Sequence, residues 1–128
     1  MKRKILFAIA LVLIVAMAFG INYFSQFQKY EAIMEDIEIG ELSLVEVEDG
    51  VYKGSFNAYL VAADVEVRII DHQIEAIKLV NHKNERGSDA EVIPERVVEA
   101  QSLDVDVVSG ASNSSRVILK AIENAFVK

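Results

Sequence analysis

The chain contains no cysteine, and this absence excludes several kinds of chemistry. Disulfides, thiolate metal sites, iron–sulfur clusters, a cysteine nucleophile and a lipidated N-terminal cysteine are all ruled out. Tryptophan is also absent, and Pro94 is the single proline. The two histidines, His72 and His82, are isolated and do not make a metal site. No nucleophile elbow or phosphate-binding glycine loop occurs, so hydrolase and nucleotide-dependent enzyme functions have no residues to support them.

Basic residues are scarce after the first 29 positions. Four of the 13 Lys and Arg residues precede Tyr30, whereas all 20 Asp and Glu residues follow it, so residues 30–128 carry a net charge of −11. A segment this acidic repels phosphate backbones, and nucleic acid is therefore not an expected partner. The length of 128 residues is enough for one small domain.

The N-terminus predicts a membrane segment. Lys2, Arg3 and Lys4 precede an apolar run, and no further charge occurs before Lys29. We expect residues 1–24 to be a single-pass transmembrane anchor in the cell membrane, because about 20 apolar residues span a bilayer. The basic cluster is expected to stay in the cytoplasm, which puts the C-terminal domain on the extracytoplasmic side. A signal peptide cleaved after residues 16–18 (Ala-Met-Ala) is the alternative.

An acidic segment follows the apolar run. Eight acids and no base lie between Glu31 and Asp49, and we interpret residues 25–41 as a solvated juxtamembrane stalk that can be helical. After Gly40 the periodicity changes, and residues 42–128 are predicted to form the functional domain.

Three neighbouring strands are expected at the start of this domain. Residues 51–60, 65–70 and 74–80 have strand patterns, and the turn signals Asp49-Gly50 and Asp71-His72 precede and separate them. Short polar turns between neighbouring strands predict an antiparallel meander. Gly54 leaves one face of the first strand open to a close approach by another element.

Helices are predicted in the second half of the domain. Residues 81–89 are polar and predict a loop, and a helix begins near residues 91–93, with Pro94 in its first turn. Residues 103–108 predict another short strand, and a final helix is indicated by an apolar stripe that includes Val117, Ile118, Ala121 and Ile122. The predicted fold class is α+β: an antiparallel β-meander packed against two helices and preceded by an N-terminal transmembrane helix.

The segment before the final helix has features of a phosphate site. It reads Asp-Val-Val-Ser-Gly-Ala-Ser-Asn-Ser-Ser over residues 106–115. Gly110 permits unusual backbone angles, the coming helix offers free N–H groups, and Arg116 and Lys120 lie in its first turns. Such a junction suits a phosphate group, although an ordinary strand–turn–helix connection has the same composition.

A family resemblance rests on this segment and on others. Asp106-x-x-Ser109-Gly110-Ala111-Ser112 resembles the Asp-x-x-Ser-Gly-Ala-Thr motif of the FMN-binding domain family, with Ser in place of Thr. That family includes flavin-carrying subunits of sodium-translocating NADH:quinone oxidoreductase and of ion-pumping ferredoxin:NAD oxidoreductase. Residues 49–54 (Asp-Gly-Val-Tyr-Lys-Gly), 65–80 and 101–106 are also similar to the family, so that the resemblance covers about residues 42–128.

The resemblance implies FMN as the cofactor, joined through its phosphate to the hydroxyl of Ser112 by a magnesium-dependent flavin transferase that uses FAD. It implies an electron-transfer carrier that works with redox partner proteins, more than a stand-alone enzyme. A non-covalent FMN binder, or a binding and assembly module without flavin, are the alternatives. The implied cofactor-binding residues are Asp106, Ser109, Gly110, Ala111, Ser112, Asn113, Ser114 and Ser115.

Other aromatic and histidine residues are weaker candidates. Tyr52, Phe56 and Tyr59 are able to stack on a flavin ring, but alternating aromatics on a strand are typical of ordinary packing. His82 is expected to be a solvent-exposed loop residue.

Overall fold

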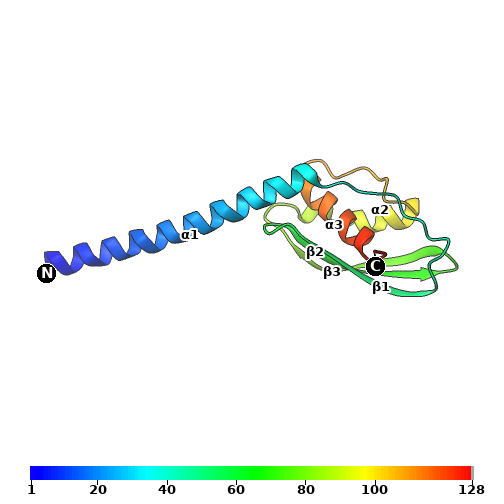
Figure 1. The fold of residues 1–128 in the computed structure, drawn as a ribbon, viewed down its shortest axis with the longest axis horizontal. Helices are drawn as coiled ribbons and strands as arrows, with labels where there is room; N and C mark the ends of the chain where they lie inside the picture. The colour runs from blue at the N-terminus through cyan, green and yellow to red at the C-terminus, as the bar shows by residue number, and fades with distance from the viewer. Residues whose placement is uncertain (128) are drawn as a thin grey trace.

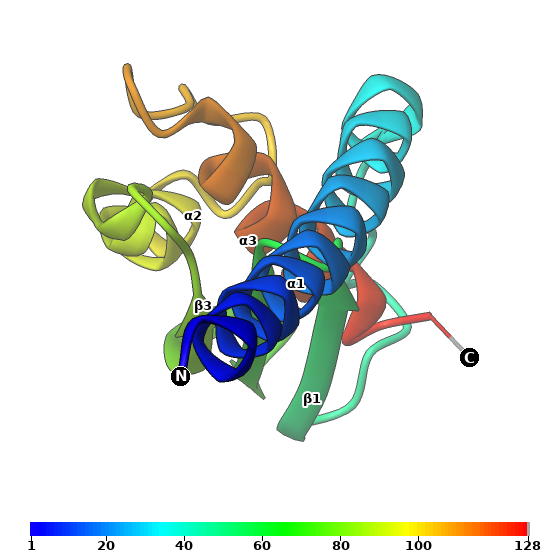
Figure 2. The same ribbon diagram turned by 90° about the vertical axis from the view of Figure 1, so that its left-hand side faces the viewer.

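The computed structural model describes residues 1–127 and has two parts, a long N-terminal helix and an α+β domain at its C-terminal end. Helix α1 (Lys2–Asp36) projects from one end of the domain (Figure 1), and Figure 2 looks along it from its N-terminal side. Strands β1 (Gly50–Asn57), β2 (Ala62–Ile70) and β3 (Gln73–Lys83) follow. The 3₁₀ turn η1 (Ser88–Val92) leads into α2 (Ile93–Ala100), and α3 (Ser112–Asn124) ends the fold.

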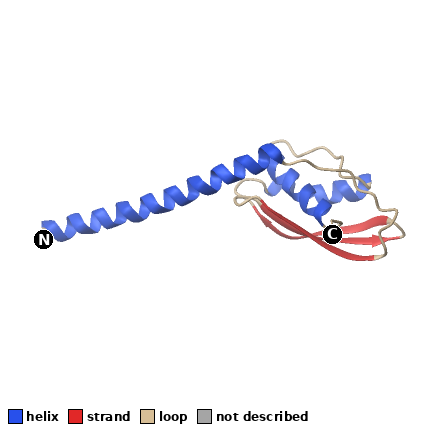
Figure 3. Cartoon of the chain, in the orientation of Figure 1, coloured by secondary structure: helices blue, strands red, loops and turns tan. Residues whose placement is uncertain are grey.

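The sheet is an antiparallel meander with the order β1-β2-β3, as predicted. Alternation in β2 puts Val65, Val67 and Ile69 against the helices, where each is 1% exposed or less. Between them, Arg68 points to the open face and lies 3.8 Å from Glu75. Helices α2 and α3 cover the other face (Figure 3), which confirms the α+β class.

Helix α3 packs closely on β1 at Gly54, where a close approach by another element was predicted. A Cβ atom at Gly54 would collide with the backbone oxygen of Ala121 and would come within 2.6 Å of the nitrogen of Ala125. The predicted apolar stripe of α3 faces the core, where Val117, Ile118 and Ile122 are fully buried. A residue without a side chain therefore allows the closest contact between sheet and helix.

Residues 103–108, which were predicted to be a strand, form no strand. Their backbone groups bond to side chains and local carbonyls rather than to a neighbouring strand. Asp104 N donates to Ser102 Oγ (2.9 Å), and Arg96 Nη1 donates to the carbonyl of Asp106 (2.9 Å). Leu103 is buried in the core and fixes the segment's position. The alternation of apolar and acidic residues thus reflects one buried anchor and exposed acids, not a sheet.

Strand β3 is longer than predicted, because residues 81–83 belong to it. Asn81, His82 and Lys83 pair with Asp64, Ala63 and Ala62 of β2. The prediction that His82 is a solvent-exposed loop residue is wrong, since its side chain is only 2% exposed. β2 extends far enough to provide hydrogen-bonding partners for residues 81–83. Polar side chains are tolerated at these positions because β3 is an edge strand of the sheet.

The acidic segment is not a free spacer in solution. Helix α1 continues to Asp36, and residues 37–49 then run along the domain without helix or strand. Met34 is buried in the hydrophobic core of the domain, and Ile33, Ile37 and Leu42 pack against this core. The carboxylates of this segment are largely exposed, whereas its apolar side chains are part of the packed domain.

Helix α1 is long and apolar enough to cross a membrane, judged by its length and composition. The large apolar side chains from Ile5 to Phe24 are exposed on all sides of the helix. No other part of residues 1–127 covers them, and the hydrocarbon of a bilayer is the solvent that suits such a surface.

Candidate functional site

The motif forms a tight turn directly before α3. Val108 to Ala111 make a β-turn closed by a hydrogen bond from Ala111 N to the carbonyl of Val108 (2.9 Å). Gly110 is its third residue and has a φ of 83°, a conformation that favours glycine and is typical of a type II turn. The space where a Cβ of Gly110 would lie is open, so the turn presents bare backbone to the solvent.

The hydroxyl of Ser115 stabilises this turn through two hydrogen bonds. Its Oγ accepts a hydrogen bond from Val108 N (3.0 Å) and donates one to the carbonyl of Ala111 (2.8 Å). The side chain is completely buried and does not line the pocket described below. Ser115 therefore bridges both ends of the turn, and we assign it a positioning role.

The start of α3 is able to bind an anion. Ser112 is its first residue, and Ala111, which is the N-cap, has no side chain that accepts a hydrogen bond. Among the described residues no side chain caps this end, so the first N–H groups of the helix are free. These groups and the helix dipole favour a phosphate at this position. Ser112 is an exposed residue beside them and lines the pocket described below.

A pocket of about 370 Å³ opens at this helix start. Gly110, Ala111, Ser112, Asn113 and Ser114 form one wall. The remaining walls come from three other segments: the C-terminal part of α1, the β1–β2 connection and the loop after β3. Their lining residues are Phe27, Tyr30, Leu60, Val61, Glu85, Arg86 and Gly87. The pocket therefore has a phosphate-compatible end, apolar and aromatic walls, and one acidic and one basic lining residue, Glu85 and Arg86.

The loop after β3 touches α3 at a second glycine. A Cβ at Gly87 would collide with the Oγ of Ser114, and Gly87 N donates to Asn84 Oδ1 (3.1 Å). Glycine at this position lets the loop lie directly on the first turn of α3, which closes one side of the pocket.

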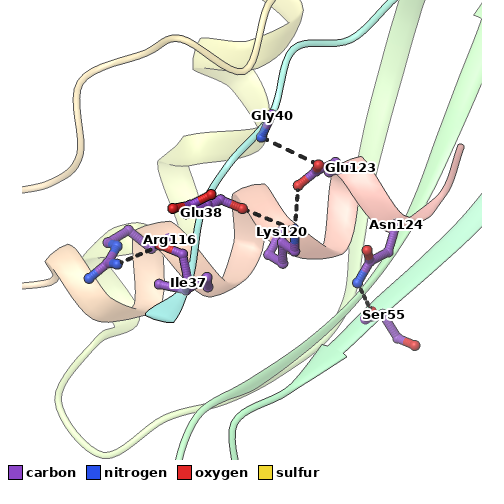
Figure 4. A network of polar contacts seen from close by, with 8 residues as sticks. All are labelled: Ile37, Glu38, Gly40, Ser55, Arg116, Lys120, Glu123 and Asn124. Carbon is purple, nitrogen blue, oxygen red and sulfur yellow. Dashed lines mark hydrogen bonds and ion pairs between the residues drawn. The ribbon is translucent and has the colours of Figure 1, made fainter. Parts of the chain in front are cut away.

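Arg116 and Lys120 do not face the pocket. Arg116 Nη2 donates to the carbonyls of Met34 (2.9 Å) and Ile37 (3.1 Å), and Lys120 Nζ donates to the carbonyl of Glu38 (3.0 Å). Figure 4 shows the contacts of Arg116 with Ile37 and of Lys120 with Glu38, both in the segment that follows α1. Both cations therefore stabilise the C-terminal end of α1, where positive charge is favourable. The sequence placed these two cations next to a phosphate site, but in the structure neither side chain lines the pocket.

Two motif residues lie outside the pocket. Asp106 and Ser109 are exposed, and neither lines it. Within residues 1–127 the carboxylate of Asp106 has no hydrogen bond or ion pair, while its backbone carbonyl accepts from Arg96. An exposed carboxylate next to the turn is accessible to a second protein.

The aromatic residues of β1 and of the β1–β2 connection point elsewhere. Tyr52 packs against Phe126 with ring centroids 5.4 Å apart, and Tyr59 lies under the ammonium group of Lys29. Phe56 lines a different hollow, beside the C-terminal turns of α1. The aromatics that do line the pocket are Phe27 and Tyr30 of α1, which the sequence analysis missed. These two residues could have been recognised from their spacing of three residues, which puts both rings on one face of a helix.

His82 lies under the loop that closes the pocket, but it does not line it. Its Nδ1 is 3.2 Å from Glu91 Oε1, and its buried Nε2 has no hydrogen-bond partner among residues 1–127. In that same part of the chain no group of three or more His, Asp or Glu residues is arranged to hold a metal ion.

Comparison with known proteins agrees with this geometry. The family model described as the FMN-binding domain matches residues 61–127, which is just over half of the chain. An uncharacterized protein of Treponema pallidum (strain Nichols) is 36% identical over 84 residues, covering 63% of this chain and 23% of the relative. The chain thus spans about a quarter of the length of that relative. The match contains β2, β3, the turn of the motif and the whole of α3, so the chain belongs to the FMN-binding domain family, and its cofactor is FMN.

Proposed function

We propose that this protein is a membrane-anchored, extracytoplasmic flavoprotein that carries FMN as a phosphoester on Ser112 and acts as an electron-transfer carrier. The observation that carries the proposal is the position of Ser112. It is an exposed hydroxyl on the first residue of α3, beside free backbone N–H groups, and it lines a pocket with aromatic walls.

The attachment is a group transfer from FAD to Ser112. The Oγ of Ser112 forms a bond to the phosphorus on the riboflavin side of FAD, and the bond between the two phosphates breaks. AMP leaves, and the hydroxyl proton passes to a base of the transferase. The exposed turn supports this proposal, because Gly110 has no side chain and the small side chain of Ala111 is buried, so neither adds bulk to the surface beside Ser112. Ser112 retains the hydroxyl that the reaction requires, although it lacks the β-branch that restricts χ1 in threonine.

When bound, FMN supplies reversible transfer of one or two electrons. The residues of this chain hold it at the surface, since both Gly110 and Ser112 are exposed. A partner protein is therefore able to approach the site directly. The net charge of −11 over residues 30–128 favours partners with basic docking patches, and such contacts should weaken as salt is added.

The proposed membrane topology is supported by two features of α1. Its apolar surface suits a bilayer, and Lys2, Arg3 and Lys4 favour a cytoplasmic N-terminus. A covalent link is useful in the extracytoplasmic space, because a dissociating cofactor would be lost there by dilution.

The attachment is tested by coexpressing the full chain with a flavin transferase and measuring its intact mass. We expect the mass of FMN less one water to be added, and fluorescence to remain in a denaturing gel. Ser112→Ala should abolish both signals, whereas Ser88→Ala, an exposed serine outside the pocket, should change neither. Unmodified wild-type protein that releases FMN on denaturation would show a non-covalent binder, and unmodified, colourless protein would contradict the proposal.

The carrier function is tested by redox titration of the purified flavinylated protein. We expect reversible reduction and reoxidation by artificial donors and acceptors, without steady turnover of NADH. Sustained oxidation of NADH by the purified protein alone would instead identify a reductase.

The topology is tested with single cysteines, because the chain has none of its own. Lys78→Cys, on the exposed face of the sheet, should react with a membrane-impermeant maleimide in intact cells, whereas Lys2→Cys should not. The opposite labelling pattern would contradict the extracytoplasmic location.

A further inference from the structure

The membrane helix contributes an aromatic corner to the FMN pocket. Phe27 and Tyr30 lie one turn apart on α1, their ring centroids are 6.4 Å apart, and both line the pocket with Ser112. Tyr30 is partly buried against the domain core, which restricts its movement. Tyr30 is therefore a fixed part of the site, and the more exposed Phe27 lies one helical turn before it.

Tyr30 is joined directly to the motif. The side-chain amide of Asn113 donates a hydrogen bond to the Tyr30 hydroxyl (2.7 Å), and Asn113 is the residue after Ser112. Residues 30 and 113 are far apart in the sequence, so this bond is a tertiary contact between α1 and the start of α3. The position of the Tyr30 ring relative to the attachment oxygen is thus fixed by the fold.

A second contact fixes the opposite rim. The hydroxyl of Tyr23 donates to Glu85 Oε1 (3.1 Å), in the loop that includes Arg86 and Gly87. Arg86 and Gly87 also line the pocket. Helix α1 therefore contacts both the motif side and the loop side, and without it the pocket would lose a wall.

We propose that Phe27 and Tyr30 of the membrane helix are the aromatic contacts for the isoalloxazine ring, so that the anchor is also part of the cofactor site. This inference rests on the proposed function. With the phosphate at Ser112 and the first turn of α3, the ring lies in the rest of the pocket, whose aromatic lining among residues 1–127 consists of Phe27 and Tyr30. Flat aromatic rings stack favourably on one another, and the phenol of Tyr30 is electron-rich.

The test uses the fluorescence of the flavinylated full chain. An electron-rich ring in contact with an excited flavin quenches its emission by donating an electron, and phenyl rings donate poorly. We expect wild-type emission to be quenched, Tyr30→Phe to raise it severalfold, and Tyr30→Trp to keep it low. Visible circular dichroism of the flavin should change with Tyr30→Phe as well, because the ring environment changes.

Tyr52→Phe is the matched control. Tyr52 is also a partly buried tyrosine, and its hydroxyl donates one hydrogen bond of 2.7 Å, to the carbonyl of Glu48. It lies outside the pocket, so this substitution should leave the emission unchanged. Phe27→Leu provides a second variant that keeps the Tyr30–Asn113 bond, and it should alter the flavin dichroism.

The outcomes separate this inference from the proposed function. Flavinylated Tyr30→Phe and Phe27→Leu proteins with wild-type emission and dichroism would overturn the aromatic contact while leaving the attachment intact. A wild-type chain that takes up no flavin would overturn the proposed function itself, and with it this inference.

Discussion

Removing the hydroxyl of Ser115 should loosen the motif turn without touching the pocket. In Ser115→Ala, Val108 N loses its acceptor, while the carbonyl of Ala111 keeps its helical bond from Ser115 N (2.9 Å). One donor is therefore left unpaired. A buried unpaired donor costs about 1–3 kcal/mol. Because this one is only partly buried, we expect the free energy of unfolding to fall by about 1–2 kcal/mol.

The assay is urea denaturation of the full chain in detergent, followed by circular dichroism. A loss of about 1–2 kcal/mol corresponds to roughly a 5- to 30-fold change in the unfolding equilibrium. Hydrogen exchange at the amide of Val108 gives a local measurement, and it should accelerate by a similar factor. Flavin attachment should also slow, because the turn that presents Ser112 is less ordered.

Ser114→Ala is the matched control for this change. Ser114 is the neighbouring buried serine, and among the described residues its hydroxyl forms no hydrogen bond. Its removal should change the free energy of unfolding by less than about 0.5 kcal/mol, since no hydrogen bond is lost. Equal stability of the Ser115→Ala and wild-type proteins, with unchanged exchange at Val108, would refute the role assigned to Ser115.

Three further substitutions test other parts of the structure. Gly54→Ala should destabilise the domain by about 1–3 kcal/mol, measured by urea denaturation, because the added Cβ meets the backbone of α3; full stability would show that this contact is not close. Ser112→Thr should be flavinylated at least as fast as the wild-type protein, because threonine restricts χ1, and timed mass spectra measure this rate. A slower rate would show that the exposed start of α3 has no room for the added methyl group. Arg116→Met should weaken the contact with the end of α1 by about 1 kcal/mol and should expose residues 37–49 to protease, whereas unchanged cleavage would contradict that contact.

Local patterns in the sequence were enough to predict much of the fold. Alternation identified β2, and the stripe of α3 identified its buried face, because one-sided burial has a period of two in strands and 3.6 in helices. Gly54 was recognised because a missing side chain in a strand has few explanations other than a close approach. The turn at Gly110 was predicted from residue types alone, and its φ of 83° agrees.

The contacts of α1 with the domain were not predictable in this way. The hydrogen bond from Asn113 to Tyr30 joins residues 83 positions apart, and no local pattern encodes such a pairing. Arg116 was expected near a phosphate because of its positive charge. The direction of its side chain is set instead by the carbonyls at the end of α1, and their position is not encoded in a local pattern. Residues 103–108 show the same limit, since a strand pattern forms a strand only where another strand offers an edge.

With α1 in the membrane as proposed, its uninterrupted length also predicts how far the site lies from the bilayer. Phe24 ends the apolar run, and Tyr30 lies six residues later, about 9 Å along the axis at the rise of an α-helix. The headgroup layer on each side of a bilayer is about 5–8 Å thick. The Tyr23–Glu85 bond brings the loop of the pocket back to the level of the last apolar residues. The flavin should therefore lie at the outer edge of the headgroups.

Spin-labelled lipids in nanodiscs test this depth. Lipids labelled at the headgroup should quench the flavin fluorescence more strongly than lipids labelled at the end of the acyl chain. A dye on Gln73→Cys is the control, because the nine residues of β2 separate that end of the sheet from the pocket by about 30 Å. The dye should be quenched by neither lipid. Equal quenching of flavin and dye would contradict a rigid connection between α1 and the domain, because a flexible tether would let both ends of the sheet approach the lipid, whereas a continuous helix allows only one.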